Sequence, residues 1–296
     1  MTKALLLGAT GFTGSHVAPL LLDAGYEVTC MVRATSDTSC LPQSRLRFVE
    51  GDLGDPQSLV DAMRGHEILV CVASIGFGHG PSIVNAARAA GIRRALFVST
   101  TAIFTSLDAR TKTVRAAAEQ AIRESGLDWT ILRPTMIYGT ARDRNMIRLI
   151  RYLRRWPVMF VIGSGQYLQQ PIHVDDVARA VVDAVKSDVT IGRAYNIAGA
   201  APLTFHQVIE IVTRLLRRRV RKLRIPVAPV VAVLRALERM HLRAPIRAEQ
   251  ILRLNEDKAF PYDEAARDFG FSPRSFEEGI AQEIASVERN AGVLAG

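Results

Sequence analysis

The sequence predicts an α/β fold in which helices cover both faces of a doubly wound parallel sheet. Apolar runs of strand length alternate with helical patterns through the first two thirds of the 296 residues. These runs are apolar throughout, which is typical of strands that are buried on both faces. A glycine-rich turn, "GATGFTG", joins the first run to the first helical pattern. Folds of this class bind their ligands at the carboxyl ends of the strands.

The order of the elements follows from these alternating patterns. Strands are predicted at 4–8, 27–32, 46–52, 67–73, 94–100 and 129–134. Helices are predicted at 13–25, 55–65, 80–91 and 110–126, whereas 33–45 has the composition of a loop. After Pro134 the alternation weakens, but a helix at 173–185 and a strand at 193–199 fit the same sheet. From about residue 202 the pattern is mostly helical.

The composition is that of an ordinary globular protein, with 48% hydrophobic and 23% charged residues. Three cysteines at unrelated spacings, Cys30, Cys40 and Cys71, indicate neither a disulfide framework nor a zinc site. The N-terminus has no signal-peptide pattern, so we expect a cytoplasmic location. The longest apolar stretch outside the predicted strands, 225–237, contains two prolines and an arginine and is too short to span a membrane.

The net charge of +9 is concentrated in two segments, 142–155 and 214–224. Both interleave Arg with Leu, Ile or Val at helix-like spacing, which most often forms a solvated helix face opposite a buried one. An anionic ligand, a partner protein or a second copy of the chain is the next alternative for these basic helices. Nucleic acid or a membrane surface is expected least, although Arg-rich patches attract any polyanion.

The glycine-rich turn predicts a dinucleotide site. Gly8 allows the sharp turn from strand to helix, Gly11 lets the backbone approach a pyrophosphate, and Gly14 lets the helix lie close to the strand. The free N–H groups and the dipole of the helix N-terminus then favour the negative charge of the pyrophosphate. We therefore expect a dinucleotide-binding Rossmann domain over 1–200. A small helical lobe over 201–296 is expected to complete the substrate side.

The residue after the second strand indicates which dinucleotide is bound. In such folds an acidic residue at this place accepts hydrogen bonds from the ribose 2′-OH, but here the strand ends "CMVR" with Arg33. An arginine pairs with a 2′-phosphate, so NADP(H) is preferred over NAD(H). The alternative is that Arg33 only caps the strand at the surface.

The chain resembles the short-chain dehydrogenase/reductase superfamily in its extended and atypical branch of epimerase/dehydratase-like proteins. The resemblance rests on "GATGFTG", "EGDLGDPQSL", "VCVAS", "FVSTTA", "LDWTILRPTMIYG", "QQPIHVDDVARAV", "GRAYNIAG" and "FGFSPRSFEEGI". It implies that Asp52 and Leu53 hold the adenine. The full set of cofactor-binding residues that it implies is Gly8, Thr10, Gly11, Phe12, Thr13, Gly14, Arg33, Asp52, Leu53, Ala73, Ser74, Ser99, Arg115 and Pro134.

The same resemblance implies a catalytic Tyr-x-x-x-Lys pair, which this sequence lacks. Active members use a Ser or Thr after the fifth strand and a Tyr-x-x-x-Lys on the next helix, in which the lysine lowers the tyrosine pKa. Thr101 fills the first position, but Thr111 and Arg115 stand at the tyrosine and the lysine. A threonine hydroxyl is too weak an acid to replace a phenol near neutral pH.

Three explanations of this absence remain open. The protein binds a dinucleotide without hydride transfer, or another group supplies the proton, or the register differs and Lys112 is used. The candidates for a displaced acid are Tyr138 and His173, and Thr101 completes the expected catalytic set. The structural alternatives are a packed aromatic ring for Tyr138 and a hydrogen-bonded residue that orients a loop for His173.

The other motifs narrow the function. "HVDD" is typical of an acidic helix start rather than a metal site, and the sequence has no GxSxG or GxxxxGK[ST] motif for a hydrolase or an NTPase. We therefore expect no metal and an NADP(H)-dependent oxidoreductase or epimerase-like enzyme acting on a small or nucleotide-sugar substrate. The alternative is a non-catalytic dinucleotide-binding protein that senses redox state or assists assembly.

Overall fold

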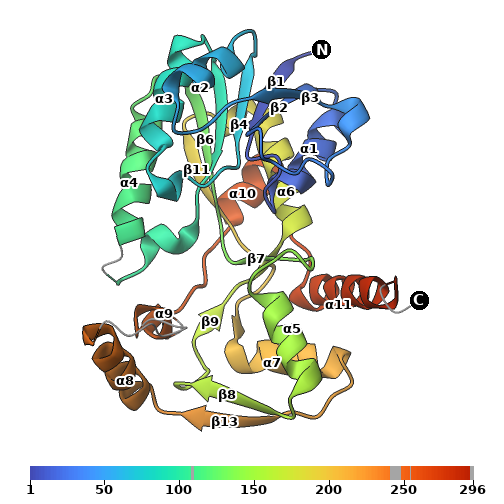
Figure 1. The fold of residues 1–296 in the computed structure, drawn as a ribbon, viewed down its shortest axis with the longest axis vertical. Coiled ribbons are helices and arrows are strands. Elements are labelled where there is room, and N and C mark those ends of the chain that lie inside the picture. The colour runs from blue at the N-terminus through green and yellow to red at the C-terminus, as the bar shows by residue number, and fades with distance from the viewer. Residues whose placement is uncertain (108–109, 241–247, 254, 294–296) are drawn as a thin grey trace.

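The centre of the molecule is a seven-stranded parallel sheet (Figure 1). The computed structural model describes residues 1–107, 110–240, 248–253 and 255–293. The strand order is β11-β6-β5-β4-β1-β2-β3, which confirms the predicted doubly wound fold. The strands are β1 (Lys3–Leu7), β2 (Glu27–Val32), β3 (Arg47–Glu50), β4 (Ile68–Cys71), β5 (Arg94–Val98), β6 (Asp128–Pro134) and β11 (Arg193–Ile197).

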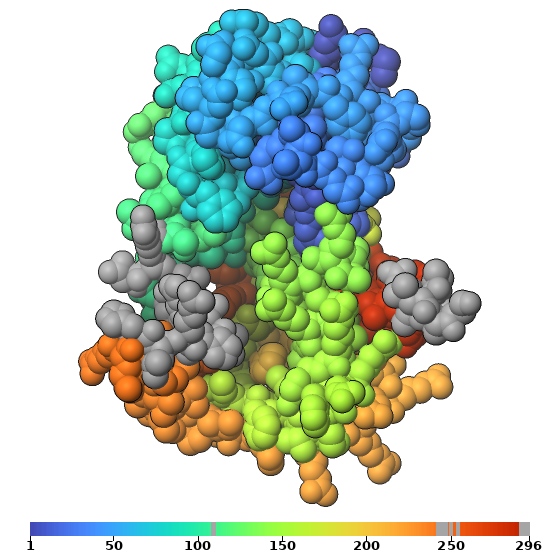
Figure 2. Space-filling view, viewed as in Figure 1, coloured from blue at the N-terminus to red at the C-terminus, as the bar shows by residue number. Residues whose placement is uncertain are grey.

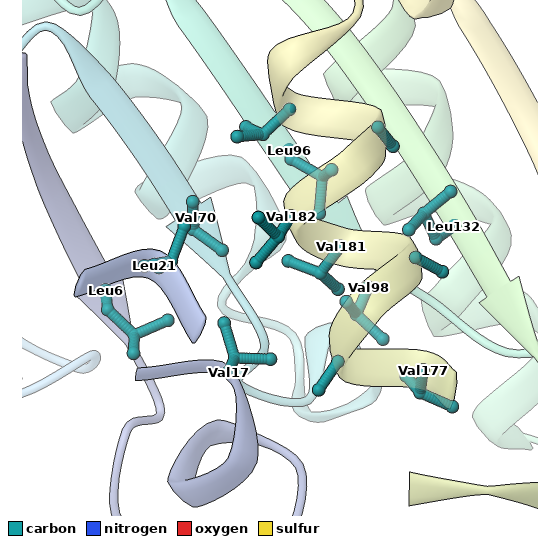
Figure 3. Close-up of a cluster of buried hydrophobic side chains, with 14 of the residues drawn as sticks. Leu6, Val17, Leu21, Val70, Leu96, Val98, Leu132, Val177, Val181 and Val182 are labelled. Atoms are coloured by element: carbon teal, nitrogen blue, oxygen red, sulfur yellow. The ribbon is translucent and has the colours of Figure 1, made fainter. Parts of the chain in front are cut away.

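Each face of the sheet has its own hydrophobic core because side chains alternate along a strand. On β1, Leu6 belongs to the core beneath α1 and α6, whereas Leu5 and Leu7 belong to the core beneath α2, α3 and α4. Figure 3 shows the first core, in which Val17 of α1 and Val181 of α6 pack against the strands. These helices are α1 (Gly14–Asp23), α2 (Pro56–Met63), α3 (Gly80–Ala89), α4 (Arg110–Arg123) and α6 (Val174–Lys186).

Short helical turns follow several strands and bring side chains to the carboxyl edge of the sheet. The turn η2 (Ile75–Phe77) follows β4, and η3 (Thr101–Phe104) follows β5. Ser74 and Thr100 begin these two turns, because their hydroxyls accept hydrogen bonds from the backbone N–H two residues later. Two further turns, η1 (Gln43–Arg45) and η4 (Asp188–Thr190), lie elsewhere.

A second part of the molecule lies below the carboxyl edge of the sheet (Figure 1). Three two-stranded sheets pair segments that are far apart in the sequence, of which β8 with β13 is the longest. The strands are β7 (Ile137–Tyr138), β8 (Val158–Ile162), β9 (Leu168–Gln169), β10 (Ile172–His173), β12 (Leu203–Thr204) and β13 (Arg221–Ile225). The helices of this part are α5 (Met146–Arg155), α7 (Phe205–Leu215), α8 (Val227–Arg239), α9 (Ala248–Arg253) and α11 (Phe276–Val293), and α10 (Asp263–Phe269) lies between α9 and α11 in the chain.

Packing contacts join segments on both sides of residue 200, and the division into two domains at this residue stays a prediction. Met146, Ile150 and Val161 share a core with Val208 of α7 and Ile280 of α11. In the other direction, α10 returns to the large sheet, where the Tyr195 hydroxyl donates to Asp268 at 2.8 Å. The lower part therefore contains the segment 137–169, and the parallel-sheet part contains α10. Sequence order alone does not separate them.

The basic segment 214–224 is not a helix, in contrast to the prediction from its spacing. Helix α7 ends at Leu215, and Arg217 adopts a left-handed backbone conformation with φ of 52°. The next residues form β13, which pairs in parallel with β8. The segment 142–155, in contrast, contains the amphipathic helix α5, which buries Ile147, Ile150 and Leu153. Its exposed arginines form the solvated face that the pattern indicates.

The sequence also raised the state of the three cysteines and the question of membrane-spanning helices. Cys30 and Cys71 are buried, Cys40 is exposed, and all three are free thiols. In the part of the chain that the structure describes, we find no helix with the length and apolar character needed to cross a membrane.

Candidate functional site

The glycine-rich turn is shaped partly by contacts within the protein and partly by open space. Gly8 has φ of +86°, and a Cβ there would lie 2.7 Å from the backbone nitrogen of Ala73. A Cβ on Gly14 would collide with the Gly8 carbonyl oxygen. A Cβ on Gly11 would have no neighbour closer than that same oxygen at 3.1 Å. Gly8 and Gly14 are thus required by packing, whereas Gly11 faces space that a ligand can use.

The start of α1 fits an anion. Thr13 precedes the helix without a side-chain capping bond, and the first turn has no acidic residue. The Ser15 N–H already donates to the Gly11 carbonyl at 3.0 Å, and the helix dipole adds positive potential at this end of α1. This arrangement, next to the open space at Gly11, is the one in which folds of this class hold a pyrophosphate.

A cavity of about 290 Å³ lies at the carboxyl ends of β4, β5 and β6, beside Thr13 at the start of α1. Ser99 lines it, is 8% exposed, and has a hydroxyl without a hydrogen-bond partner among the described residues. Arg115 reaches it from α4, and a Cβ on Gly76 would lie only 2.8 Å from the Arg115 Nε. The predicted cofactor residues on this cavity are Thr13, Ser74, Ser99, Arg115 and Pro134.

A second cavity, of about 430 Å³, lies beyond the glycine-rich turn at the end of β2. Thr10 and Arg33 line it, and Arg33 is the residue that the sequence assigns to a 2′-phosphate. Arg142 lines it as well, and its guanidinium donates to the Thr10 carbonyl oxygen at 2.9 Å. Sequence reasoning missed Arg142 because it counted this residue with the basic face of the segment 142–155.

The remaining predicted cofactor residues lie around these two cavities. Asp52 follows β3 and accepts from the Gly54 N–H at 2.7 Å, and Leu53 packs against the core under α2. Ala73 contacts Gly8, and the Phe12 ring lies edge-on to His16 with centroids 6.0 Å apart. None of these four residues lines either cavity, so their contact with a cofactor stays a prediction.

A third and larger cavity, of about 690 Å³, lies between the sheet edge and the lower part of the molecule. Figure 2 shows the surface hollowed between these two parts. The cavity shares Thr100 and Thr135 with the 290 Å³ cavity. Thr101 also lines it, and the Thr101 hydroxyl donates to the Pro134 carbonyl at 3.3 Å. The two cavities are therefore adjacent along one edge of the sheet.

The segment 255–260 forms one side of the large cavity, and sequence reasoning missed it. Glu256 accepts hydrogen bonds from the Thr105 hydroxyl at 2.6 Å and from the Ser106 N–H at 2.9 Å. Partial burial opposes ionisation, but these hydrogen bonds hold the pKa of Glu256 below its ordinary value. Its carboxylate thus fastens the segment to the end of η3. No local sequence motif identifies Glu256, because the residues that donate hydrogen bonds to it lie about 150 residues earlier in the chain.

Tyr138 and His173, the two displaced-acid candidates, pack against each other away from the cavities. Their ring centroids are 5.4 Å apart, and the Tyr138 hydroxyl donates to the Phe276 carbonyl at 3.4 Å. Burial raises the pKa of Tyr138. Burial also lowers the pKa of His173 to about 4, while its Nδ1 accepts from the Asp175 N–H and caps α6. Both environments favour neutral groups that pack and cap.

The helix that carries the family's Tyr-x-x-x-Lys positions brings only one of the two to a cavity. Arg115 lines the 290 Å³ cavity, whereas Thr111 is exposed. Lys112, the alternative in a shifted register, donates from Nζ to the Thr105 carbonyl at 2.7 Å. The acidic start of α6 is likewise used within the protein, since Asp176 accepts from Arg274 Nε at 3.0 Å. Among the described residues no three His, Cys, Asp or Glu side chains are grouped to hold a metal ion.

Comparison with known proteins identifies the family. A sequence model of the NAD(P)H-binding family matches residues 8–188. Subunit 9 of the NADH dehydrogenase (ubiquinone) 1 alpha subcomplex, a mitochondrial protein of Arabidopsis thaliana, is 27% identical over 90% of this chain and 71% of its own length. A ceramide reductase of Caulobacter vibrioides is 31% identical over 62% of this chain and 61% of its own length.

A solved structure agrees with this result at the level of the fold. The dTDP-glucose 4,6-dehydratase DesIV of Streptomyces venezuelae, solved with NAD bound, superposes with a TM-score of 0.75. It covers 98% of both chains at 21% sequence identity. The chain therefore belongs to the NAD(P)H-binding family and has its Rossmann fold, which confirms the predicted resemblance.

Proposed function

We propose that this member of the NAD(P)H-binding family is an NADP(H)-dependent oxidoreductase or epimerase-like enzyme. One observation supports this proposal above the others: the 290 Å³ cavity at the end of the glycine-rich turn shares Thr100 and Thr135 with a 690 Å³ cavity. A reactive ring in the smaller cavity would face a small substrate or a sugar group in the larger one. Such adjacency is what transfer between two bound molecules requires.

The residues that would hold the cofactor fit a dinucleotide. Gly11 and the start of α1 would hold the pyrophosphate, Arg33 the 2′-phosphate, and Ser99 and Arg115 the nicotinamide riboside. When bound, the nicotinamide supplies hydride transfer. The chain's own part is to orient the two molecules and to exclude water between the sheet edge and the lower part.

Thr101 is the proposed contact of the chain to the substrate oxygen. Thr101 lines the large cavity, and its hydroxyl already donates to the Pro134 carbonyl. The Thr101 oxygen would therefore accept a hydrogen bond from a substrate hydroxyl while the Thr101 O–H keeps donating to that carbonyl. Thr101→Val should lower turnover at least about 10-fold. The matched control is Thr111→Val, at an exposed position on α4, which should leave turnover unchanged.

Cofactor preference is tested by titrating NADPH and NADH separately against the protein. Arg33 lies at the surface beside Thr10, where a 2′-phosphate would receive charge-assisted hydrogen bonds of about 1.5–3 kcal/mol. The wild type should bind NADPH at least about 10-fold more tightly than NADH. Arg33→Asp should remove or invert this ratio. Equal affinities of the wild type would refute the NADP(H) preference.

A second candidate function is dinucleotide binding without catalysis, as a redox-sensing or assembly protein. The exposed Thr111 in place of the family's tyrosine favours it, as does the buried packing of Tyr138 and His173. The relative from Arabidopsis thaliana is named as a subunit of a larger complex. In this case NADPH raises the melting temperature of the protein, but no carbonyl or nucleotide-sugar compound gives cofactor turnover.

We also propose a cytoplasmic location and a protein partner for the basic segments. Arg214 of the segment 214–224 pairs with Glu277, while Arg218 and Arg219 are exposed. These exposed arginines would suit a second copy of the chain or an acidic partner protein. Ultracentrifugation of the purified chain at low and high salt tests self-association, and cell fractionation tests the location.

A further inference from the structure

We propose that Arg142 is a second ligand of the cofactor's 2′-phosphate, opposite Arg33, and thereby a determinant of the preference for NADP(H). The inference rests on the NADP(H) preference proposed above and names the residue that completes it. Arg142 lies in the segment that joins β7 to α5, more than a hundred residues from the glycine-rich turn. It nevertheless lines the same 430 Å³ cavity as Thr10 and Arg33.

The side chain of Arg142 is already held against the glycine-rich turn. One terminal nitrogen donates to the Thr10 carbonyl at 2.9 Å, and the other donates to the Ser15 hydroxyl at 3.3 Å. A guanidinium has five N–H donors in a planar fork, so donors remain for a phosphate. Because these contacts hold the guanidinium beside the cavity, little side-chain freedom would be lost when an anion binds.

The charges around the cavity favour an anion with several acceptor oxygens. Asp37 lines the same cavity as Arg33 and Arg142, and its carboxylate oxygen Oδ1 accepts a hydrogen bond from the Ser39 N–H at 2.9 Å. The hydrogen bonds from Ser39 lower the pKa of Asp37, so its charge is present and weakens the net positive potential without cancelling it. Thr35 and Ser36 add hydroxyls to the lining. A bare ribose diol would use none of this charge.

The backbone around Arg142 is fixed by the residue that follows it. Asp143 is 6% exposed and accepts from the N–H groups of Asn145 at 2.6 Å and Ile147 at 3.3 Å. The Arg142 N–H donates to the Thr140 hydroxyl at 3.1 Å. Arg144, two residues further, is exposed and does not line this cavity. Arg142 is thus set apart from the other arginines of its basic segment.

The experiment compares ligands that differ only in the 2′-phosphate. Adenosine 2′,5′-bisphosphate and adenosine 5′-phosphate are titrated by calorimetry against the wild type, Arg142→Gln, Arg33→Gln and the double variant. Arg142→Gln should weaken the bisphosphate by about 10- to 100-fold and the monophosphate by less than about threefold. Arg144→Gln is the matched control and should change neither affinity. The double variant should lose less than the product of the two single losses, because both residues bind one phosphate.

The outcomes separate this inference from the function on which it rests. If the wild type does not distinguish the two ligands, the NADP(H) preference itself fails, and the inference fails with it. If the wild type prefers the bisphosphate and Arg142→Gln keeps that ratio, only the inference is overturned. An equal loss for both ligands also overturns it, since Arg142 would then act only by shaping the turn at Thr10.

Discussion

The cofactor side and the substrate side of the molecule are assembled in opposite ways. The cofactor side depends mainly on a contiguous turn, residues 8–14, and on the residues that follow β2, β4, β5 and β6, to which the segment after β7 adds Arg142. The large cavity is lined by residues from distant stretches of the chain, within 100–106, 135–136, 145, 169 and 255–260. A site built from one turn and regular strand ends keeps its ligand class throughout a family. A site built from distant segments can change its substrate without changing the fold.

The largest effect that tests this comparison is expected at Gly11. In Gly11→Val the side chain would extend into the open space that the pyrophosphate needs, so NADPH affinity should fall at least about 100-fold. The fold should survive, because a Cβ there meets only the Gly8 oxygen at 3.1 Å. Calorimetry and circular dichroism measure the two effects. Gly14→Val is the contrasting variant, and it should fail to fold because its side chain would overlap the turn itself.

The capping role of His173 predicts a pH-dependent stability. Burial lowers its pKa to about 4, while in the unfolded chain the pKa is near 6.5, so the unfolded state binds the proton first on acidification. The free energy of unfolding should therefore fall by about 3 kcal/mol as the pH drops from about 6.5 to about 4. Urea unfolding at several pH values measures it. His173→Gln should flatten this slope.

A smaller effect is expected where Glu256 fastens the substrate side. Glu256→Ala removes the acceptor of Thr105 and Ser106 and should lower the free energy of unfolding by about 1–2 kcal/mol. NADPH affinity should stay within about twofold, because no cofactor cavity contains this residue. Glu264→Ala, at an exposed position on α10, is the control. A large loss of NADPH affinity in Glu256→Ala would show that the two sides are not independent.

The smallest effect is expected for Tyr138→Phe. The variant loses one hydrogen bond, from the hydroxyl to the Phe276 carbonyl at 3.4 Å, and should cost about 0.5–1 kcal/mol of stability. Turnover should change by less than about threefold, since Tyr138 lines none of the three cavities described above. Steady-state rates and thermal melts check this. A loss of turnover near 100-fold would instead make Tyr138 the displaced general acid.

The sequence predicts the parallel sheet well because its signals are local. The continuous apolar runs of β1 to β6 and the turn at Gly8 carry the positions of these elements along the chain within a few residues each. The conformation of 214–224 was not predictable in the same way. The strand β13 forms in this segment because it pairs with β8, about 60 residues earlier in the chain. The local spacing of apolar residues carries no information about such a distant partner.

The site residues likewise differ in whether the local sequence identifies them. Arg33 could be named because it follows a recognisable strand, and Arg115 because the family resemblance aligns it with the lysine; both line a cavity. Arg142 and Glu256 could not be named, since each matters only through contacts with residues more than a hundred positions away. Their local sequence marks them as one arginine among many and as one carboxylate in a polar loop.

A crystal structure of the chain with NADP⁺ tests the central claim most directly. We expect the pyrophosphate over Gly11 and the start of α1, and the 2′-phosphate between Arg33 and Arg142. We expect the nicotinamide beside Ser99 and Arg115, with its C4 atom open toward Thr100, Thr135 and the 690 Å³ cavity. A nicotinamide turned away from that cavity, or an adenosine end that leaves Arg33 and Arg142 without contact to the phosphate, would refute the proposed binding mode.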